Sequence, residues 1–375
     1  EFAKKFQVPV HVRSSSSDSP GTMIVSEPES PGRPVCGVAL VKNQARISVT
    51  GMPDRPGAAL TLVSAIAAKQ VAVDMIVQNV GEDGLADISL TVFRDDLPTA
   101  LMAVEEAAGQ LGAIAHSYDD DVSCISVVGL NMAEQTGVAN KMFRSLADAG
   151  INIYMISTSH IKISVLVARD SAIEALHSVH PAFELEKEPD TPIALTNMAP
   201  RKPPDAAAVV AKMQDMEGLI IEAISLDESQ ARMTLHSVPN SPGLAADVFD
   251  EITEAGVVVD MIVQSYSGKG TADLSFTFPK EDLEKTFETS RRITERFGCR
   301  PPTSCPQIAL LSVYGIGLRS HTQVASRMFE SLGVAGINVE MINTSEVCVS
   351  VVVDEKQGGK GLAALEKAFE DVLVS

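Results

Sequence analysis

An internal duplication constrains this chain more than any other feature. The segment GAALTLVSAIAAKQVAVDMIVQ at residues 57–78 recurs as GLAADVFDEITEAGVVVDMIVQ at residues 243–264. The segment MFRSLADAGINIYMISTS at residues 142–159 recurs as MFESLGVAGINVEMINTS at residues 328–345, with the same offset of 186 residues and no gap. The two halves of the chain are therefore tandem copies of one unit.

Each half contains a weaker repeat of its own. VDMI at 73–76 aligns with IYMI at 153–156, an offset of 80 residues, and the same step carries the MI of 261–262 onto that of 341–342. The sequence thus predicts four similar modules, arranged as two duplicated pairs. Modules of this size, about 70 to 80 residues, bury a modest core, so we expect them to pack against one another.

The first module carries patterns that predict its fold. Apolar side chains alternate with a period of two at 71–78 and 88–92, and a strand is also expected at 46–50. Helical spacing predicts one helix from Gly57 and another over 97–111. With a further closing strand the order is βαββαβ. This order is typical of the ferredoxin-like α+β fold, in which two helices cover one face of a four-stranded antiparallel sheet.

Two linkers divide the chain. Residues 21–34 are rich in Ser, Pro and Gly, and residues 189–204 contain five prolines, which is typical of surface connectors. The predicted divisions are an N-terminal segment and linker at 1–33, a first module at 34–119, a second at 120–190, a linker at 191–215, a third module at 216–302 and a fourth at 303–375.

Composition excludes several classes of protein. Hydrophobic residues make up 45% of the chain, which favours packed globular modules over a disordered chain. The formal charge of −19 repels phosphate backbones and anionic lipid, and the strands lack the aromatic residues that stack RNA bases. No run of about 18 apolar residues predicts a membrane span. We therefore expect neither nucleic acid nor a membrane as a partner.

Metal and nucleophilic chemistry find no local support. The five cysteines are scattered and never spaced as C-x-x-C, which argues against a disulfide framework or a zinc site and predicts a reducing cytoplasm. The seven histidines show no metal-ligand spacing. No G-x-S-x-G, G-x-x-x-x-G-K-[ST] or G-x-G-x-x-G motif follows a strand. We predict no catalytic residue and no metal ligand.

The turns before two helices offer the first candidate site. DRPG at 54–57 in the first module matches NSPG at 240–243 in the third. A helix N-terminus presents free amides that suit a carboxylate, while Asp54 suits an ammonium group, so together they suit an amino acid zwitterion. The alternative is that Asp54 or Asn240 caps the helix. Other residues could complete a site or be ordinary strand ends and turns. The polar ones are Gln78, Gln264, Asn152, Asn338, 157–159 and 343–346, and Val138–Ala139 and Val324–Ala325 precede the helices of modules two and four.

These residues resemble the ACT modules of the aspartate kinase family. The resemblance rests on DRPG at 54–57, DMIVQN at 74–79 and DIS at 87–89, together with NI at 152–153 and ISTS at 156–159. It covers nearly the whole chain, and it implies four tandem ACT modules of the regulatory region.

The N-terminal segment resembles the last helix and strand of that family's kinase domain. KKFQVPVHVRSS at 4–15 and PGT at 20–22 carry this likeness, so 1–33 is expected to be the end of that domain and its linker. The family's K-F-G-G-T-S motif and glycine-rich nucleotide loop are missing. Because the chain starts at Glu1 rather than methionine, we expect it to be part of a longer protein and inactive as a kinase on its own.

The resemblance also implies that amino acid effectors bind between paired modules, and it assigns effector residues by position. They are Asp54, Gly57, Ala59, Val71, Ala72, Val73 and Gln78 in the first module; Val138, Ala139, Asn152, Ile153, Ser159 and His160 in the second; Asn240, Gly243, Ala245 and Gln264 in the third; and Val324, Ala325, Asn338, Val339, Ser345 and Glu346 in the fourth.

Two positions depart from the family pattern. His160 stands where glutamate is common, although the fourth module has Glu346, and Asn240 replaces the usual aspartate of the turn. Losing that charge weakens an ammonium contact. We expect either a site in the first half that includes Asp54 and Ser159 or a site in the second half around Gly243, Gln264 and Glu346. The two halves are free to differ in ligand or in affinity.

The resemblance implies a regulatory function. The family phosphorylates L-aspartate with ATP to 4-phospho-L-aspartate, at the start of lysine, threonine and methionine biosynthesis. This chain is expected to sense lysine, threonine or both and to mediate feedback inhibition. Its expected partners are the effector, a kinase domain or chain, and further copies through ACT pairing. No cofactor is expected here, since ATP and Mg serve the kinase domain. The alternative is an independent regulatory subunit acting on a separate kinase chain.

Overall fold

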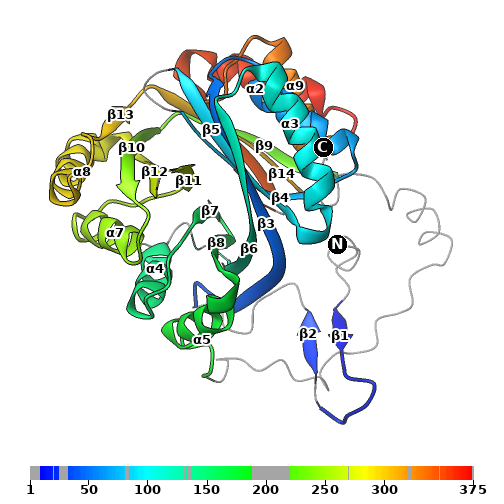
Figure 1. Cartoon of the computed structure of the whole chain (residues 1–375), viewed down its shortest axis with the longest axis vertical. Coiled ribbons are helices and arrows are strands. Elements are labelled where there is room, and N and C mark those ends of the chain that lie inside the picture. Colours follow the sequence, from blue (N-terminus) through cyan, green and yellow to red (C-terminus); the bar gives the residue numbers. More distant parts are fainter. Residues whose placement is uncertain are drawn as a thin grey trace.

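The described residues form a 14-stranded sheet with helices on its outer faces, together with a separate two-stranded hairpin (Figure 1). The computed structural model describes residues 9–19, 21–24, 33–80, 84–130, 132, 135, 137–187, 220–268, 270–316, 318, 323–345 and 347–373. The predicted linker at 191–215 lies outside these ranges. In the N-terminal segment, β1 (Val10–Val12) and β2 (Thr22–Ile24) pair as the antiparallel hairpin.

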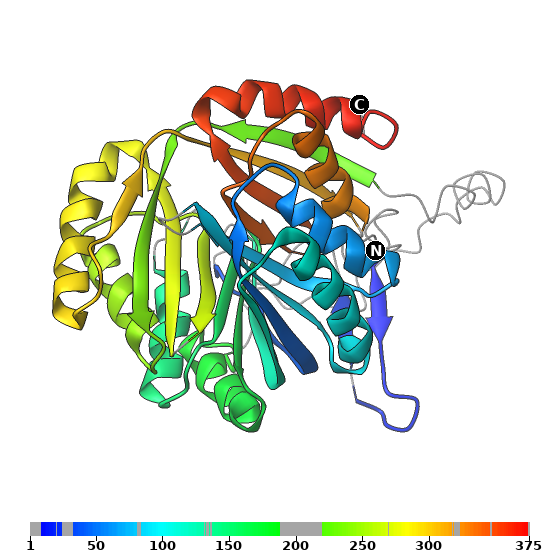
Figure 2. The same ribbon diagram turned by 45° about the horizontal axis from the view of Figure 1, so that its top comes forward.

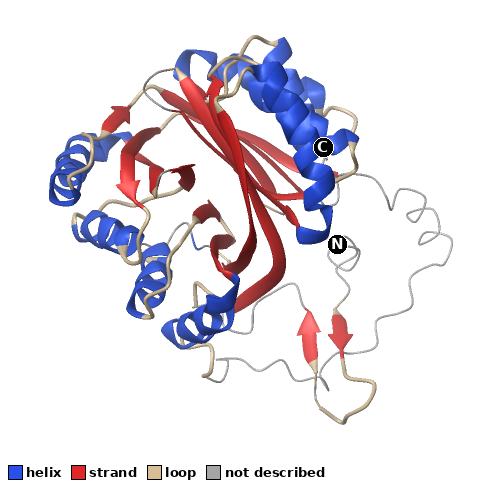
Figure 3. Cartoon of the chain, in the orientation of Figure 1, coloured by secondary structure: helices blue, strands red, loops and turns tan. Residues whose placement is uncertain are grey.

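The elements follow the predicted α+β order. Figure 3 shows the strands of the large sheet in the interior and the helices on the outside. In the first half they are β3 (Gly37–Pro53), α2 (Ala58–Ala68), β4 (Val73–Val80), β5 (Leu85–Phe93), η1 (Arg94–Asp96), α3 (Leu97–Leu111), β6 (Ala115–Val128), α4 (Val138–Asp148), β7 (Met155–Ser159), β8 (Lys162–Ala168), η3 (Arg169–Ser171) and α5 (Ala172–Ala182).

The second half repeats this order, which confirms the duplication of the fold. Its elements are β9 (Ile220–Asp227), β10 (Gln230–Pro239), α7 (Leu244–Glu254), β11 (Ile262–Gly268), β12 (Thr271–Pro279), η5 (Lys280–Asp282), α8 (Leu283–Phe297), β13 (Thr303–Cys305), β14 (Ile308–Ile316), α9 (Gln323–Val334), β15 (Met341–Thr344), β16 (Cys348–Asp354), η6 (Glu355–Gln357) and α10 (Gly358–Ala368).

Strand pairing departs from the predicted divisions in both halves. Strand β13, placed at the start of the predicted fourth module, pairs with β10 of the third. The start of β3, from Gly37 to Val41, pairs with the end of β6 and so lies in the sheet of the second module, whereas the rest of β3 lies in the first. Likewise β9 pairs with β14 of the fourth module, although it precedes the third. In each half, the segment preceding one module therefore supplies an edge strand to the other, a crossing that periodicity alone does not reveal.

The four modules associate as two pairs within the chain. Strand β4 of the first module pairs with β15 of the fourth, and β7 of the second pairs with β11 of the third, both antiparallel. Helix α2 packs beside α9, and α4 beside α7. Figure 2 shows modules one and four on one side of the molecule and modules two and three on the other.

Three apolar cores hold this arrangement. One lies beneath the helices of modules one and four, and a second beneath those of modules two and three. The third lies between the strands of the two pairs and includes Met75, Met155, Met261 and Met341. These four positions are equivalents within the fourfold repeat, so the motif that reveals the repeat also supplies the apolar contact between the pairs.

Candidate functional site

Pocket A lies where the first module meets the fourth. It is lined by the start of α2, by Gln78 of β4 and by the segment leading into β15. Asn338 Nδ2 donates to Asp54 Oδ1 at 2.8 Å, and Gln78 Nε2 donates to the carbonyl of Val339 at 2.6 Å. Asp54, Gly57, Ala59, Gln78, Asn338 and Val339, all predicted as site residues, are thereby brought together.

Pocket B is the equivalent site between the third module and the second. Asn152 Nδ2 donates to Asn240 Oδ1 at 2.9 Å, and Gln264 Nε2 donates to the carbonyl of Ile153, also at 2.9 Å. The described lining further includes Gly243 and Ala245 but no ionisable side chain, whereas Asp54 and Arg55 line pocket A. The two pockets share their geometry and differ in charge.

The helix-capping alternative is wrong for both turns. Gly57 and Gly243 occupy the N-cap positions of α2 and α7 with φ of 88° and 90°, and neither helix has a side-chain cap. Asp54 and Asn240 instead point to an asparagine of the paired module. The N-terminal amides of both helices therefore keep the partial positive charge that attracts an anion.

Pockets C and D form on the opposite side of each pair. Pocket C combines Val71, Val73 and Asp74 of the first module with Ala325, Thr344 and Ser345 of the fourth. Pocket D combines Val138, Ala139, Thr158 and Ser159 of the second module with Asp260 and Ile262 of the third. Each combines a helix start from one module with the lead-in to a strand from the other, as pockets A and B do.

Beside each of these pockets, a threonine hydroxyl forms a hydrogen bond that links strands of the two paired modules. Thr344 Oγ1 accepts from the amide of Ile76 at 2.8 Å, and Thr158 Oγ1 accepts from the amide of Ile262 at the same distance. Both contacts join paired modules and both are buried. The lining of pockets C and D is therefore continuous with the hydrogen bonds that hold each pair together.

His160 joins three modules beside pocket D. Its Nε2 lies 2.9 Å from Tyr314 Oη of β14, and the two rings stack. Its Nδ1 lies 3.8 Å from Asp260 Oδ1 of the third module. Burial raises the pKa of Asp260, and the charge of a protonated His160 opposes that rise. A fifth pocket, lined by residues of modules two, three and four, lies here and also contains Asn343 and Ser350.

The structure regroups the predicted residues. Asp54 and Ser159, expected in one first-half site, lie in different pockets, because the first module pairs with the fourth and the second with the third. Every pocket therefore combines residues from both halves, and the half-by-half assignment is wrong. Ala72 and Val324 do not line these pockets, and Glu346 falls outside the described residues.

Sequence reasoning missed two carboxylates. Asp74 lines pocket C and Asp260 lines pocket D, and the two occupy equivalent positions in the halves. Gln44 Nε2 donates to Asp74 Oδ2 at 3.2 Å. Both residues stand in the repeated VDMI segment. An aspartate present in both copies of an otherwise apolar segment is the sequence feature that could have indicated them.

Two other kinds of site are absent from the residues that the structure describes. None of the helices in the described ranges combines the length and apolarity that a bilayer crossing requires. Across the same ranges, no three His, Cys, Asp or Glu side chains are placed to hold a metal ion.

Comparison with known proteins gives a consistent result. Models of the ACT domain match residues 45–109, 125–183 and 311–369. The aspartate kinase of Stutzerimonas stutzeri is 41% identical over 188 residues, and the aspartokinase of Pseudomonas aeruginosa is 41% identical over 189; each match covers 50% of this chain and 46% of the relative. The chain thus spans about half the length of these relatives.

A solved structure extends the likeness to the whole fold. The aspartate kinase from Synechocystis superimposes with a TM-score of 0.80 at 31% sequence identity, covering 98% of this chain and 62% of that one. The arrangement of all four modules therefore has a counterpart in a known protein.

Proposed function

Because this chain belongs to the aspartate kinase family and forms its ACT-domain regulatory region, we propose that it senses lysine, threonine or both. Effector binding would control the phosphorylation of L-aspartate by ATP in a kinase domain or chain. That reaction would open the lysine, threonine and methionine pathways, with end-product control acting through the ACT pairs. ATP and Mg would bind the kinase part and not this region. The family relationship and the pockets between modules support this proposal.

Pocket A carries the proposal. It places the carboxylate of Asp54 opposite the amide of Asn338, beside the uncapped start of α2. An amino acid would direct its ammonium group to Asp54 and its carboxylate to the free amides of the helix. Gln78 would order the backbone at Val339 rather than contact the ligand directly, because its Nε2 already donates there.

Binding across a module boundary explains how such a ligand could act at a distance. A ligand in pocket A contacts the first and the fourth modules at once. It would favour whichever arrangement of the pair brings Asp54 and Asn338 together. A shift between two arrangements requires only that they differ in ligand affinity, with a coupling of about 1 to 3 kcal/mol.

The pockets are complete within one chain. We expected further copies to associate through ACT pairing, yet the four modules already pair among themselves. Assembly into an oligomer stays a prediction, and effector binding does not depend on it.

Calorimetric titration of the chain with lysine and then threonine tests the proposal. We expect saturable binding, weakened by Asp54→Ala and by Asn338→Ala, since these changes remove the two sides of pocket A. Ser159→Ala is the matched change in pocket D and should leave the pocket A isotherm unaltered. A folded chain that binds neither amino acid would contradict the proposed function.

A further inference from the structure

The main chain passes between the two module pairs at two places, which we call crossings, and the two crossings are built differently. At the first crossing, in the first half, β3 and β6 each run without interruption from one pair into the other. They pair with each other from Gly37 to Thr50, with register shifts on both sides of Gln44. Such bulges leave main-chain carbonyls without ladder partners.

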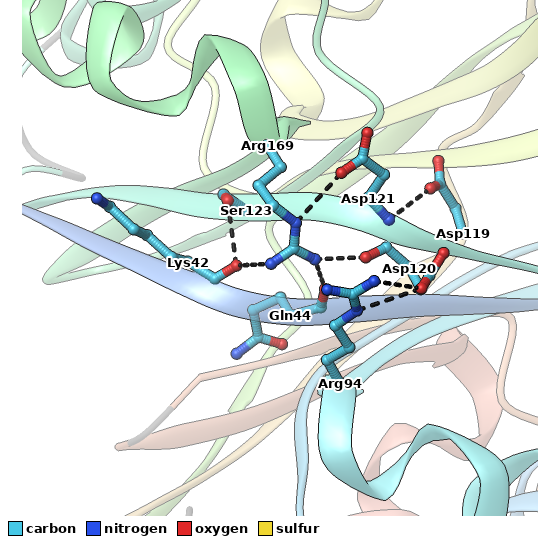
Figure 4. A network of polar contacts seen from close by, with 8 residues as sticks. All are labelled: Lys42, Gln44, Arg94, Asp119, Asp120, Asp121, Ser123 and Arg169. Atoms are coloured by element: carbon cyan, nitrogen blue, oxygen red, sulfur yellow. Dashed lines mark hydrogen bonds and ion pairs between the residues drawn. The ribbon is translucent and has the colours of Figure 1, made fainter.

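Arg169 binds the main-chain carbonyls exposed by this irregularity. Its guanidinium donates to the carbonyls of Lys42 (2.6 Å) and Gln44 (3.2 Å) on β3, and to the carbonyl of Asp120 on β6. Its Nε also donates to the carboxylate of Asp121 at 3.2 Å. As Figure 4 shows, one side chain from η3 thus ties together both strands of the crossing.

Arg94 reinforces the same crossing from the first module. Its Nη2 lies 2.9 Å from Asp120 Oδ2, and its Nε also donates to that oxygen (Figure 4). The neighbouring main chain is ordered by Asp119, which accepts from the amide of Asp121 at 3.0 Å. The first crossing is therefore fastened by two arginines, one from each module.

The second crossing, in the second half, is interrupted in both strands. Glu228 and Ser229 separate β9 from β10, and Pro306 and Gln307 separate β13 from β14. Strand β10 pairs with β13 on one side, and β9 with β14 on the other. Two main-chain bonds remain, from Lys280 to Ser229 (2.9 Å) and from Glu355 to Gln307 (3.1 Å).

Charge pairs replace the arginine clamp at this place. Lys280 and Glu355 hold the positions that Arg94 and Arg169 hold in the first half, and they bind each other at 2.6 Å, each with about a third of the side chain exposed. Nearby, Arg232 of the third module binds Glu340 of the fourth at 2.9 Å. A carboxylate has no N–H to donate, so Glu355 cannot bind the freed carbonyls as Arg169 does.

We propose that the second crossing is the hinge between the two module pairs, with the Lys280–Glu355 pair as its latch, and that the arginine-clamped first crossing is the fixed side. Hinges are typically short segments at the ends of elements, as 228–229 and 306–307 are. An exposed ion pair weakens as salt rises. Arg169 in the clamp binds three main-chain carbonyls, and salt screens these bonds less than it screens an ion pair. The Arg94–Asp120 pair is open to the same screening as the latch, so we expect the first crossing to be less sensitive to salt but not insensitive.

Through the hinge, effector binding in one module pair could change the position of the other pair. Pockets A and C lie in one pair and pockets B and D in the other. Opening at the second crossing, with the first crossing holding the pairs together, would change how the pairs sit against each other while leaving each pair intact. This consequence rests on the proposed function; the hinge itself does not.

Hydrogen exchange followed by mass spectrometry tests the hinge on the full chain without any effector. Amides at 227–231 and 305–309 should exchange faster than those at 41–46 and 119–124. Raising NaCl to about 0.5 M should increase exchange at the second crossing by about 2- to 5-fold, the range expected for a partly exposed ion pair. The increase at the first crossing should be smaller, because the bonds from Arg169 to main-chain carbonyls remain there. Equal protection at the two crossings, or an equal response to salt, would overturn the proposal.

Variants locate the latch. Glu355→Gln and Lys280→Met should each raise exchange at the second crossing at low salt and abolish most of its salt response. Arg169→Met is the matched control and should loosen the first crossing alone. If Glu355→Gln increased exchange equally at both crossings, the pair would be a general stabiliser rather than a latch. The salt titration of the unaltered chain decides the matter even if a variant fails to fold.

Discussion

Asn79 donates through its Nδ2 to the hydroxyl of Ser265 at 2.9 Å. Ser265 occupies the position equivalent to Asn79 in the second half, 186 residues later. Ser157 in turn donates its hydroxyl to Oδ1 of its counterpart Asn343. A residue meets its own copy only near the axis that relates the copies. The axis of the duplication therefore runs through the middle of the molecule, where module one meets module three and module two meets module four.

Asn79→Ala should destabilise the fold. The side chain is buried, and its Nδ2 also donates to the carbonyl of Asp273 at 3.0 Å. Removing it leaves that carbonyl and the Ser265 hydroxyl without this donor, at an expected cost of about 1 to 3 kcal/mol in the free energy of unfolding. Urea denaturation measures this cost.

A double-mutant cycle with Ser265→Ala separates the contact from general packing. We expect the two changes to be non-additive, because each removes one partner of the same hydrogen bond. Strict additivity would show that the two halves do not communicate through this contact.

Module fold was predictable because its determinants are local. Alternating apolar residues at 71–78 and 88–92 and helical spacing at 97–111 each require a few neighbouring residues, and all three elements are present. Modules two to four followed from the repeat. The crossing of Gly37–Val41 into the second module was not predictable, since an apolar edge strand has the same pattern in either sheet.

Pairing could not be predicted for a related reason. Gln78 and Gln264 end identical DMIVQ segments, so nothing local distinguishes the module that each one meets. Which surfaces pair depends on helix contacts such as α2 with α9 and on the apolar layer between the pairs. The same ambiguity caused the half-by-half grouping of Asp54 with Ser159, although nearly all of the described site residues do line pockets.

Exchanging the charges of pockets A and B should exchange their affinities. Asp54→Asn should weaken binding of an amino acid in pocket A by about 10- to 100-fold, because a hydrogen bond to a charged group contributes about 1.5 to 3 kcal/mol. Asn240→Asp should strengthen pocket B, where Asn152 already provides the matching amide. Titration calorimetry of both single variants and the double variant measures the exchange.

The Asn240→Asp result is the more informative half of that experiment. Loss of binding in Asp54→Asn could follow from any disturbance of pocket A, whereas a gain in pocket B requires the carboxylate to act on the ligand. Unchanged affinity in pocket B would contradict an ammonium contact at this turn.

Thr344→Val should loosen modules one and four without affecting modules two and three. Valine keeps the shape but cannot accept from the buried amide of Ile76. An unsatisfied buried amide costs about 1 to 3 kcal/mol. Hydrogen exchange should rise at β4 and β15. Thr158→Val is the matched control, expected to raise exchange at β7 and β11 instead; a response spread over both pairs in either variant would refute the independence of the pairs.

Asp87 and Asp273 are equivalent carboxylates whose pKa values move in opposite directions. Each accepts from a main-chain amide, of Gly51 at 2.8 Å or of Ser237 at 2.7 Å. Burial raises the pKa of Asp87, and the charge of Asp273 adds to the rise. Burial acts on Asp273 as well, but the nearby His236 ring, 3.8 Å away, and the hydrogen bond from the Ser237 amide outweigh it and lower its pKa.

The two asparagine variants should therefore respond oppositely to pH. Ionised Asp273 stabilises the fold above its unfolded pKa near 3.8, and this contribution disappears as the pH falls through its lower folded pKa. Asp87 ionises at a cost, so its contribution to stability falls as the pH rises from about 3.8 through its higher folded pKa. Relative to the unaltered chain, Asp273→Asn should become less stable as the pH increases from acid values to about 4. Asp87→Asn should become more stable than the unaltered chain as the pH increases above about 4. Urea unfolding between about pH 2.5 and 7 measures both trends, and parallel curves for the two variants would show that His236 does not distinguish the two sites.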